Sequence, residues 1–192
     1  MKNLLTVILL FCCVAVFSQI RERGDIELYA TIGSNQSGSS TTFTNARNSV
    51  KFGVLGDYFF NDRWSLRSGL VSLKMGDEGF IFILRDFETN YIHIPVNANW
   101  HFGSTRKWNL NFGLSAGFLT SAEENGLDIK DQIEFFQLGI SYGIGYKLAF
   151  SERFALLFDL QAFSGLTDYL KNNAAEERNV ASSISIGAVF KL

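Results

Sequence analysis

Two histidines, His93 and His101, are the residues of this chain best suited to proton transfer. A hydrolase or an acyltransferase needs a nucleophile and a base within hydrogen-bond reach of each other. Both histidines fall on the less apolar face of one predicted strand, eight residues apart, and neither belongs to a histidine-x-serine motif. The sequence therefore predicts interior or rim histidines with ordinary hydrogen-bond partners, and no catalytic residue.

A second candidate for chemistry is the acidic stretch 121–134. It contains Glu123, Glu124, Asp128, Asp131 and Glu134 against one basic residue, Lys130. Carboxylate oxygens can bind Ca²⁺, but the stretch lacks the spacing and the glycine of an EF-hand. We interpret it as a solvated surface loop and predict no metal site and no cofactor. The alternative uses are bridging by divalent cations to anionic lipopolysaccharide and binding of a basic partner.

The segment that must position these residues is a predicted hairpin over 91–120. Apolar and polar residues alternate from Tyr91 to Phe102, and the alternation resumes at Trp108 after a polar turn at 103–107. A period of two held for about 10 residues is typical of a transmembrane β-strand. Strands of soluble proteins are usually about 5–6 residues long. The hairpin therefore predicts a membrane-spanning β-sheet.

The same alternation recurs along the chain and predicts an all-β fold, an eight-stranded antiparallel up-and-down transmembrane β-barrel. Long connections alternate with short turns, which fits surface loops on one side of the membrane and periplasmic turns on the other. The stretch 76–90 is predicted as a loop that can continue its flanking strands above the membrane. The predicted strands are 25–33, 49–60, 64–75, 91–102, 108–120, 135–150, 154–165 and 180–192.

Aromatic residues gather at the three short turns, near Asn61, Ser104 and Ser151. Amphipathic rings favour the depth of the lipid headgroups, so these residues predict an interfacial girdle. The predicted girdle residues are Phe59, Phe60, Trp64, Trp100, Phe102, Trp108, Phe150 and Phe154.

Periodicity alone also allows a soluble barrel with its apolar face inward. The polar faces of 108–120, 135–150 and 180–192 are mostly Gly, Ser and Asn, which suits a narrow interior better than a soluble surface. An eight-stranded barrel is filled by side chains, so we predict no open pore. We predict that the inward charges pair with one another, because a buried unpaired charge is costly. These charges are Glu27, Lys51, Asp57, Arg67, Lys147, Asp159 and Lys191.

Residues 1–18 have the pattern of a secretory signal peptide, with Lys2, an apolar run and Ser18 before the expected cleavage. An uncleaved anchor is disfavoured because the apolar run is too short to cross a membrane as a helix. We therefore divide the chain into a signal peptide, 1–18, and an outer-membrane β-barrel domain, 19–192.

Both cysteines, Cys12 and Cys13, lie in the predicted signal, so the barrel domain has no disulfide. Phe11 stands where a lipoprotein signal needs a small residue, which argues against lipidation. The formal net charge of −2 argues against nucleic-acid binding.

At residues 91–96 (YIHIPV) and 110–117 (LNFGLSAG) the chain resembles the PorT-like outer-membrane β-barrel family, common in Bacteroidetes. The resemblance implies location in the cell outer membrane, contact with its lipid and lipopolysaccharide, and insertion by the barrel-assembly machinery. One branch of the family is linked to protein secretion and gliding. Pro95 cannot donate to a β-ladder, so we expect a bulge or a bend there.

The leading interpretation is a small non-catalytic outer-membrane barrel for envelope structure or for interaction through its loops, with a possible envelope protein partner. The alternative is a component of a secretion or gliding assembly. The third reading is an enzyme that modifies lipid A, as some small outer-membrane barrels resemble lipid A deacylases, acyltransferases or proteases.

Overall fold

The computed structural model describes residues 21–39, 45–78, 86–171 and 176–192. The predicted signal peptide lies outside these ranges and stays a prediction. The same holds for residues 79–85 of the predicted loop 76–90.

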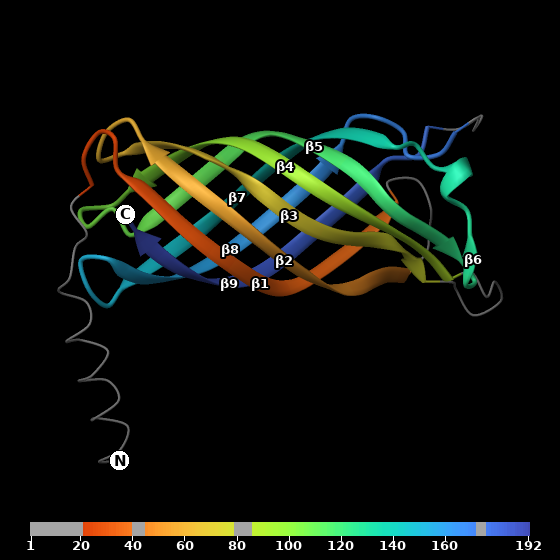
Figure 1. Cartoon of the computed structure of the whole chain (residues 1–192), viewed down its shortest axis with the longest axis horizontal. Helices are drawn as coiled ribbons and strands as arrows, with labels where there is room; N and C mark the ends of the chain where they lie inside the picture. Colours follow the sequence, from red (N-terminus) through yellow and green to blue (C-terminus); the bar gives the residue numbers. More distant parts are fainter. Residues whose placement is uncertain (1–20, 40–44, 79–85, 172–175) are drawn as a thin grey trace, which may run out of the picture.

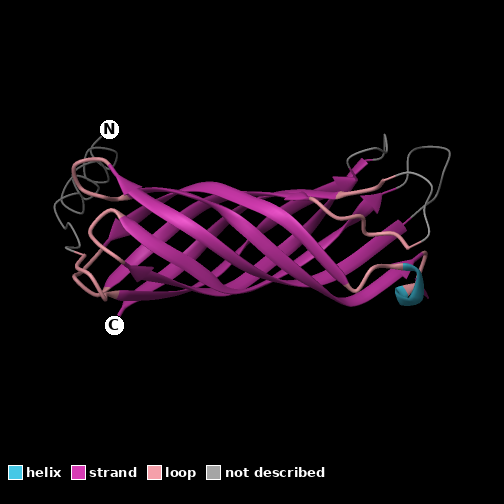
Figure 2. Cartoon of the chain, turned by 90° about the horizontal axis from the view of Figure 1, so that it is seen from above, coloured by secondary structure: helices cyan, strands magenta, loops and turns pink. Residues whose placement is uncertain are grey.

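Eight long strands, each antiparallel to its neighbours, form the wall of a barrel (Figures 1 and 2). Their order around the barrel is β1, β2, β3, β4, β5, β7, β8, β9, and β9 pairs with β1 to close the cylinder. The predicted all-β, up-and-down barrel is confirmed. The strands are β1 Ile26–Ser39, β2 Asn45–Phe59, β3 Trp64–Glu78, β4 Asp86–Phe102, β5 Trp108–Glu124, β7 Phe136–Ala149, β8 Phe154–Gly165 and β9 Asn179–Lys191.

Two short elements sit at the long-loop end of the barrel, at the right of Figure 1. Strand β6, Leu127–Asp128, folds back onto the end of β5, and a 3-10 helix, Lys130–Gln132, follows it. No helix in the described part of the chain is long and apolar enough to cross a membrane. The short turns and the C-terminus lie at the other end, which is the periplasmic end for a barrel of this kind.

Several strands are longer at the extracellular end than the sequence pattern predicts. The described residues of the predicted loop 76–90 belong to β3 and β4, as expected for strands that continue above the membrane. The prediction of a loop over 121–134 is wrong for residues 121–124, which extend β5. The 17 residues of β4 span about 43 Å of height at a tilt of about 40°, against an apolar band about 25 Å tall. The strands therefore project beyond the hydrocarbon layer.

Apolar side chains cover the outer surface, and polar side chains together with a buried hydrophobic cluster that includes Leu55, Leu73 and Leu157 fill the interior. Phe112 and Leu114 on β5 are 51% and 52% exposed, whereas Asn109 and Asn111 on the same strand are buried. Because strand side chains alternate between faces, each strand contributes one residue in two to the lipid-facing surface. The alternative of a soluble barrel with an apolar interior does not fit this arrangement.

The aromatic girdle surrounds the periplasmic end of the barrel. Trp100 lies between Trp64 and Phe102, with ring centroids 6.3 Å and 5.1 Å away. The contacts continue to Trp108, whose ring lies 6.3 Å from that of Phe102. These rings form one belt at the depth of the headgroups.

Phe59 is a correction to the predicted girdle. Its side chain is fully buried and points into the lumen, while its neighbour Phe60 is 50% exposed. Consecutive residues of a strand point to opposite faces, so only one of the two can meet lipid.

A bulge or a bend was expected at Pro95, and the strand pairing shows an interruption there but no bulge. Pairing of β3 with β4 is interrupted opposite Ile94 and Pro95 but keeps one register on both sides, while β4 and β5 shift register between Asn90 and Tyr91. The register places Gly69 opposite Pro95. Gly69 has φ of 154°, and a Cβ there would lie 2.2 Å from the carbonyl oxygen of Val54. Gly69 thus lets β3 adopt this backbone conformation opposite Pro95, which has no N–H to donate to β3.

Replacing Leu114 by Arg should destabilise the barrel by about 2–4 kcal/mol, because the substitution places a charge near mid-bilayer depth on the lipid face. Leu127→Arg is the matched control, since Leu127 is 71% exposed on β6 at the extracellular end. Urea unfolding of both variants in lipid vesicles measures the difference. Equal stability of the two variants would contradict the assignment of the lipid-facing surface.

Candidate functional site: the lumen and the extracellular end

A network of buried charges crosses the lumen near its periplasmic end. Asp57 on β2 accepts hydrogen bonds from Arg67 Nε at 3.1 Å and from Lys147 Nζ at 2.9 Å. It also accepts hydrogen bonds from Asn99 Nδ2 at 3.1 Å and from the Tyr29 hydroxyl at 3.2 Å. Five strands therefore meet at one carboxylate.

A second carboxylate, Glu27 on β1, extends this network toward the periplasm. Lys147 donates to it, and Arg21 Nε donates to Glu27 Oε1 at 2.6 Å. Arg21 also donates to the carbonyl of Arg106 at 2.9 Å and lies over the ring of Phe59 at 5.2 Å. The segment before β1 thus folds into the mouth of the barrel.

The predicted pairing of inward charges is confirmed for five of the seven residues: Glu27, Asp57, Arg67, Lys147 and Asp159. Lys191 pairs instead with Asp25 at the periplasmic rim, at 2.5 Å. Lys51 lies farther up the lumen and donates to Ser183 Oγ at 2.9 Å.

Sequence reasoning missed Arg21, which precedes the first strand, where no alternation marks the direction of a side chain. Tyr29 lies on the predicted inward face of Glu27, but its hydrogen bond to Asp57 on β2 could not be read from the pattern.

Higher in the lumen, Gln137 on β7 connects four strands. Its Nε2 lies 3.0 Å from His93 Nε2 on β4 and 3.8 Å from Met75 Sδ on β3, and its Oε1 accepts from Asn179 Nδ2 on β9 at 3.0 Å. Gln137 and Met75 are fully buried. These side chains form a second layer across the lumen.

Between the two layers lies a small chamber of about 60 Å³, whose apolar lining residues include Leu55, Val71, Leu73 and Phe163. A water molecule needs roughly 10–15 Å³ of such space, so the chamber has room for about four. Its charged lining residues are Lys51, Arg67 and Asp159, and its polar lining residues include Asn35, His93, Ser115 and Ser183. The lumen is therefore filled rather than open.

Both histidines point into the lumen, as predicted. His93 Nδ1 lies 3.1 Å from Ser115 Oγ, and His101 Nε2 lies 2.9 Å from Ser65 Oγ. A histidine beside a serine is the pair that acyl transfer requires, but each pair is buried at 3% exposure or less. Lipid substrates outside the wall do not reach either serine.

A hydrophobic cluster organises the extracellular end: Phe87, Tyr91, Leu119, Ala122, Ile133 and Tyr169. Backbone hydrogen bonds fix the segments around it, from Ile129 N to the carbonyl of Ala122 at 3.0 Å and from Glu134 N to the carbonyl of Tyr169 at 2.9 Å. The cluster joins the segment after β5 to the segment after β8.

Tyr169 anchors this cluster to the segment before β9. Its hydroxyl donates to Glu177 Oε2 at 2.6 Å. Burial, and then this hydrogen bond, raise the pKa of Tyr169 well above its ordinary value, so the hydroxyl stays a neutral donor.

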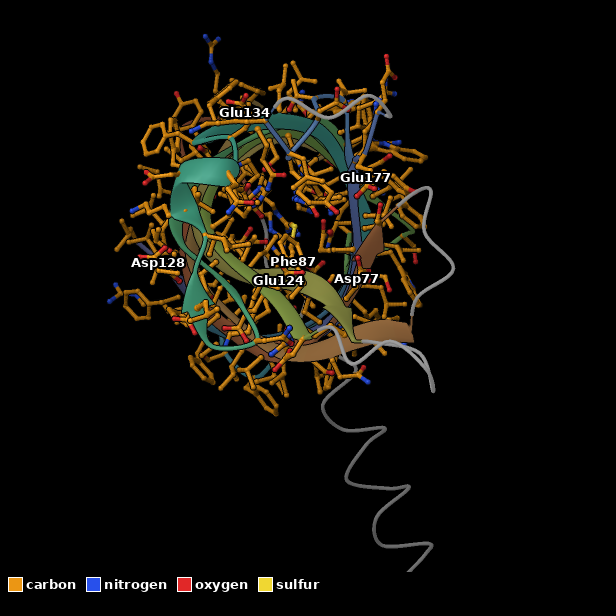
Figure 3. The ribbon with its side chains drawn as sticks, turned by 90° about the vertical axis from the view of Figure 1, so that its right-hand side faces the viewer. Asp77, Phe87, Glu124, Asp128, Glu134 and Glu177 are labelled. Carbon is orange, nitrogen blue, oxygen red and sulfur yellow. The ribbon has the colours of Figure 1, made fainter. Side chains whose placement is uncertain are left out.

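The extracellular end is acidic. Figure 3 looks into this end and shows Asp77, Glu124, Asp128, Glu134 and Glu177 spread around the mouth. Some of the acidic side chains are paired, since Arg47 binds both Asp86 and Glu88. In the described part of the chain, no group of three or more His, Cys, Asp or Glu side chains is placed to hold a metal ion.

Residues 17–171 match the sequence model of a family described as "Outer membrane protein beta-barrel domain". The chain belongs to this family. No curated protein sequence matches it. As an outer membrane β-barrel protein it resides in the cell outer membrane, where its outer surface contacts lipid.

Solved outer membrane barrels share the fold. Neisserial surface protein A is 15% identical with a TM-score of 0.56, covering 87% of this chain and 97% of that one. OprG of Pseudomonas aeruginosa is 12% identical with a TM-score of 0.53, covering 91% and 99%. Ail of Yersinia pestis is 16% identical with a TM-score of 0.50, covering 88% and 100%. At these identities the likeness establishes the fold alone.

Replacing Lys147 by Met in this outer membrane barrel should cost about 3–5 kcal/mol, because Glu27 and Asp57 lose the cation that they share while staying buried. Lys191→Met is the control: its pair with Asp25 is partly exposed, so its loss should cost about 0–1 kcal/mol. Urea unfolding of both variants in vesicles gives the two values. Similar costs would show that the buried network does not hold the strands together.

Proposed function

We propose that this outer membrane barrel is a non-catalytic, non-conducting protein that serves envelope structure or interacts through its extracellular end. The observation that carries the proposal is the acidic extracellular end above a lumen filled by side chains. The cluster around Tyr169 fixes the described segments after β5 and β8 against each other at this end, and two side-chain layers occupy the path that a solute would follow.

The charge of the extracellular end suggests two kinds of partner. Carboxylates around the mouth attract a basic protein surface directly, and they approach anionic lipopolysaccharide through bridging divalent cations. We further propose that the signal peptide is removed after Ser18 and that the barrel-assembly machinery inserts the chain. An envelope protein partner is part of this proposal.

The alternative is a role in a secretion or gliding assembly of the PorT type in Bacteroidetes, supported by the YIHIPV motif at 91–96. A lipid A-modifying enzyme is the third candidate. The burial of His93 and His101 argues against it, because their serine neighbours face the lumen and not the lipid.

Neutralising the extracellular acids should weaken binding at this end. The test variant carries Glu123→Gln and Asp131→Asn, and the control carries Glu22→Gln and Glu152→Gln at the periplasmic end; all four residues are exposed. Barrels in nanodiscs are titrated with lipopolysaccharide vesicles containing Mg²⁺ and, separately, with an oligolysine peptide. We expect several-fold weaker binding of at least one probe for the test variant alone.

Chelation with EDTA separates the two kinds of partner, because it abolishes bridging by cations and leaves the oligolysine contact intact. Unchanged binding of both probes by the test variant would contradict an interaction role for the acidic end. Stoichiometric co-purification of secretion components would favour the assembly. Lipid A modification that is lost in His93→Ala would favour the enzyme.

A further inference from the structure

The strand register fixes the height at which each outward residue lies in the membrane. A ring of register partners that starts at Ile26 on β1 crosses all eight long strands and returns to β1 at Gln36, ten residues farther along. With strands about 4.8 Å apart and a rise of about 3.3 Å per residue, this offset tilts the strands by about 40°. Each residue then gains about 2.5 Å of height, and each step around the ring gains about 3 Å. The ring is Ile26, Tyr58, Leu66, Ala98, Phe112, Tyr142, Ala162, Ser182 and Gln36.

On β4 and β5 the outer surface is apolar over the full height expected for a membrane barrel. The outward residues run from Phe102 to Ile92 on β4 and from Trp108 to Phe118 on β5. Each stretch rises by about 25 Å, which equals the usual height of the apolar band. Phe118 lies at the top of this side, with its ring 5.6 Å from that of Phe136 on β7.

On β1 and β9 the outer surface becomes polar at a lower height. The last large apolar residues are Ile32 and Ile184, which are 59% and 67% exposed. The apolar stretches that end there rise by only about 15 Å. The next outward residues are Ser34 and Gln36 on β1 and Ser182 on β9, and all three are exposed.

Strand β8 extends this low side of the barrel, which we define as β8, β9 and β1. On β8, Leu160 is followed at the outward positions by Ala162 and Ser164. Larger apolar residues return on β9 and after β8 only at Val180 and Leu166, above about 25 Å. The low side is therefore continuous across three neighbouring strands.

The apolar band is thus wedge-shaped, because β9 and β1 lie opposite β4 and β5 in the ring of eight strands. Strand β3 also carries a serine at this height, Ser72. This serine is an isolated break, since Val50 on β2 and Ile92 on β4 are apolar at a similar height. A tilt of the whole barrel does not explain the wedge, because the aromatic girdle keeps the periplasmic edge of the band level.

A hollow in the outer surface follows the low side. Its lower lining includes the apolar Leu160 and Ile184, and its upper lining includes the polar Ser34, Gln36 and Ser182. This order, from apolar to polar toward the extracellular end, matches an outer-leaflet lipid, whose acyl chains lie below its carbonyl groups and headgroup.

We propose that the outer leaflet is thinned by about 10 Å along the low side, so that lipid headgroups and their ester or amide linkages contact Ser34, Gln36 and Ser182. Hydroxyl and amide groups in hydrocarbon would lack hydrogen-bond partners, whereas lipid carbonyls and water satisfy them at headgroup depth. A bilayer resolves such a mismatch by local thinning. The polar residues lie within about 5 Å of one height on three strands, so they follow the membrane plane. The inference does not depend on the extracellular partner.

Depth-dependent fluorescence quenching tests the proposal. Both cysteines lie in the predicted signal peptide, so residues 19–192 accept a single label. A polarity-sensitive fluorophore is attached at Ser182→Cys and, as the matched control on β5, at Ala116→Cys; both positions lie about 22 Å above Ile26. In nanodiscs, aqueous iodide should quench the Ser182 label, and nitroxides on acyl chains should quench the Ala116 label.

Two results would overturn the proposal. Equal quenching of both labels by acyl-chain nitroxides would show a leaflet of uniform thickness. Protection of the Ser182 label from both quenchers would show that protein, such as a second copy of the chain, covers the low side instead of lipid headgroups.

Leucine substitutions give a second readout without a label. Ala116→Leu adds apolar surface within hydrocarbon and should raise the folded-to-unfolded ratio by at least about tenfold in lipid vesicles. Ser182→Leu should raise this ratio by less, because its new side chain enters the headgroup region. A larger gain for Ser182→Leu than for Ala116→Leu would place Ser182 in hydrocarbon and refute the thinning.

Discussion

Inside the membrane every backbone N–H and C=O must form a hydrogen bond within the protein, and this requirement governs the structure. Hydrocarbon offers no hydrogen bonds, so a sheet can cross the membrane only as a closed cylinder. The pairing of β1 with β9 and of β4 with β5 removes the edges that a flat sheet would expose. Closure with eight strands then fixes a narrow interior. The polar side chains that alternate with the lipid-facing residues therefore point into that interior.

The buried charges and polar groups of the interior are satisfied in two layers. Near the periplasm, Asp57 and Glu27 gather cations from different strands, and rings of Phe59 and Tyr29 lie beside Lys147 at 5.7 Å and 5.8 Å. Higher up, uncharged groups around Gln137 close the lumen with hydrogen bonds. Removing one member of the charged layer leaves its partners buried, so this layer ties distant strands together more strongly than any exposed pair could.

The two ends of the barrel differ for a related reason. Short periplasmic turns keep the strands at the depth of the aromatic girdle. At the other end, β4 and β5 extend beyond the hydrocarbon layer. The hydrophobic cluster around Tyr169 supports these exposed strand ends. The extracellular end is therefore a small folded surface of its own, which makes it the natural place for contacts with a partner.

Much of the fold could be predicted because alternation with period two directly encodes the two faces of a strand. The strand count, the short turns, the outward position of Leu114 and the inward position of both histidines follow from it. Strand ends at the extracellular side could not be predicted, since residues 121–124 (SAEE) show no clear apolar alternation and gain their pairing from β4 and β6. Phe59 was misassigned because a girdle residue and an interior residue are neighbours in sequence. The pairing partners of Lys51 and Arg21 depend on three-dimensional placement that no local pattern carries.

Side chains close the lumen of this lipid-embedded barrel. Single-channel recording of the refolded chain in a planar lipid bilayer tests this closure. The protein should insert without steady ionic conductance across neutral pH and moderate voltage. A stable, ohmic conductance of the wild-type protein would contradict it, because ions could then pass both the Asp57 layer and the Gln137 layer.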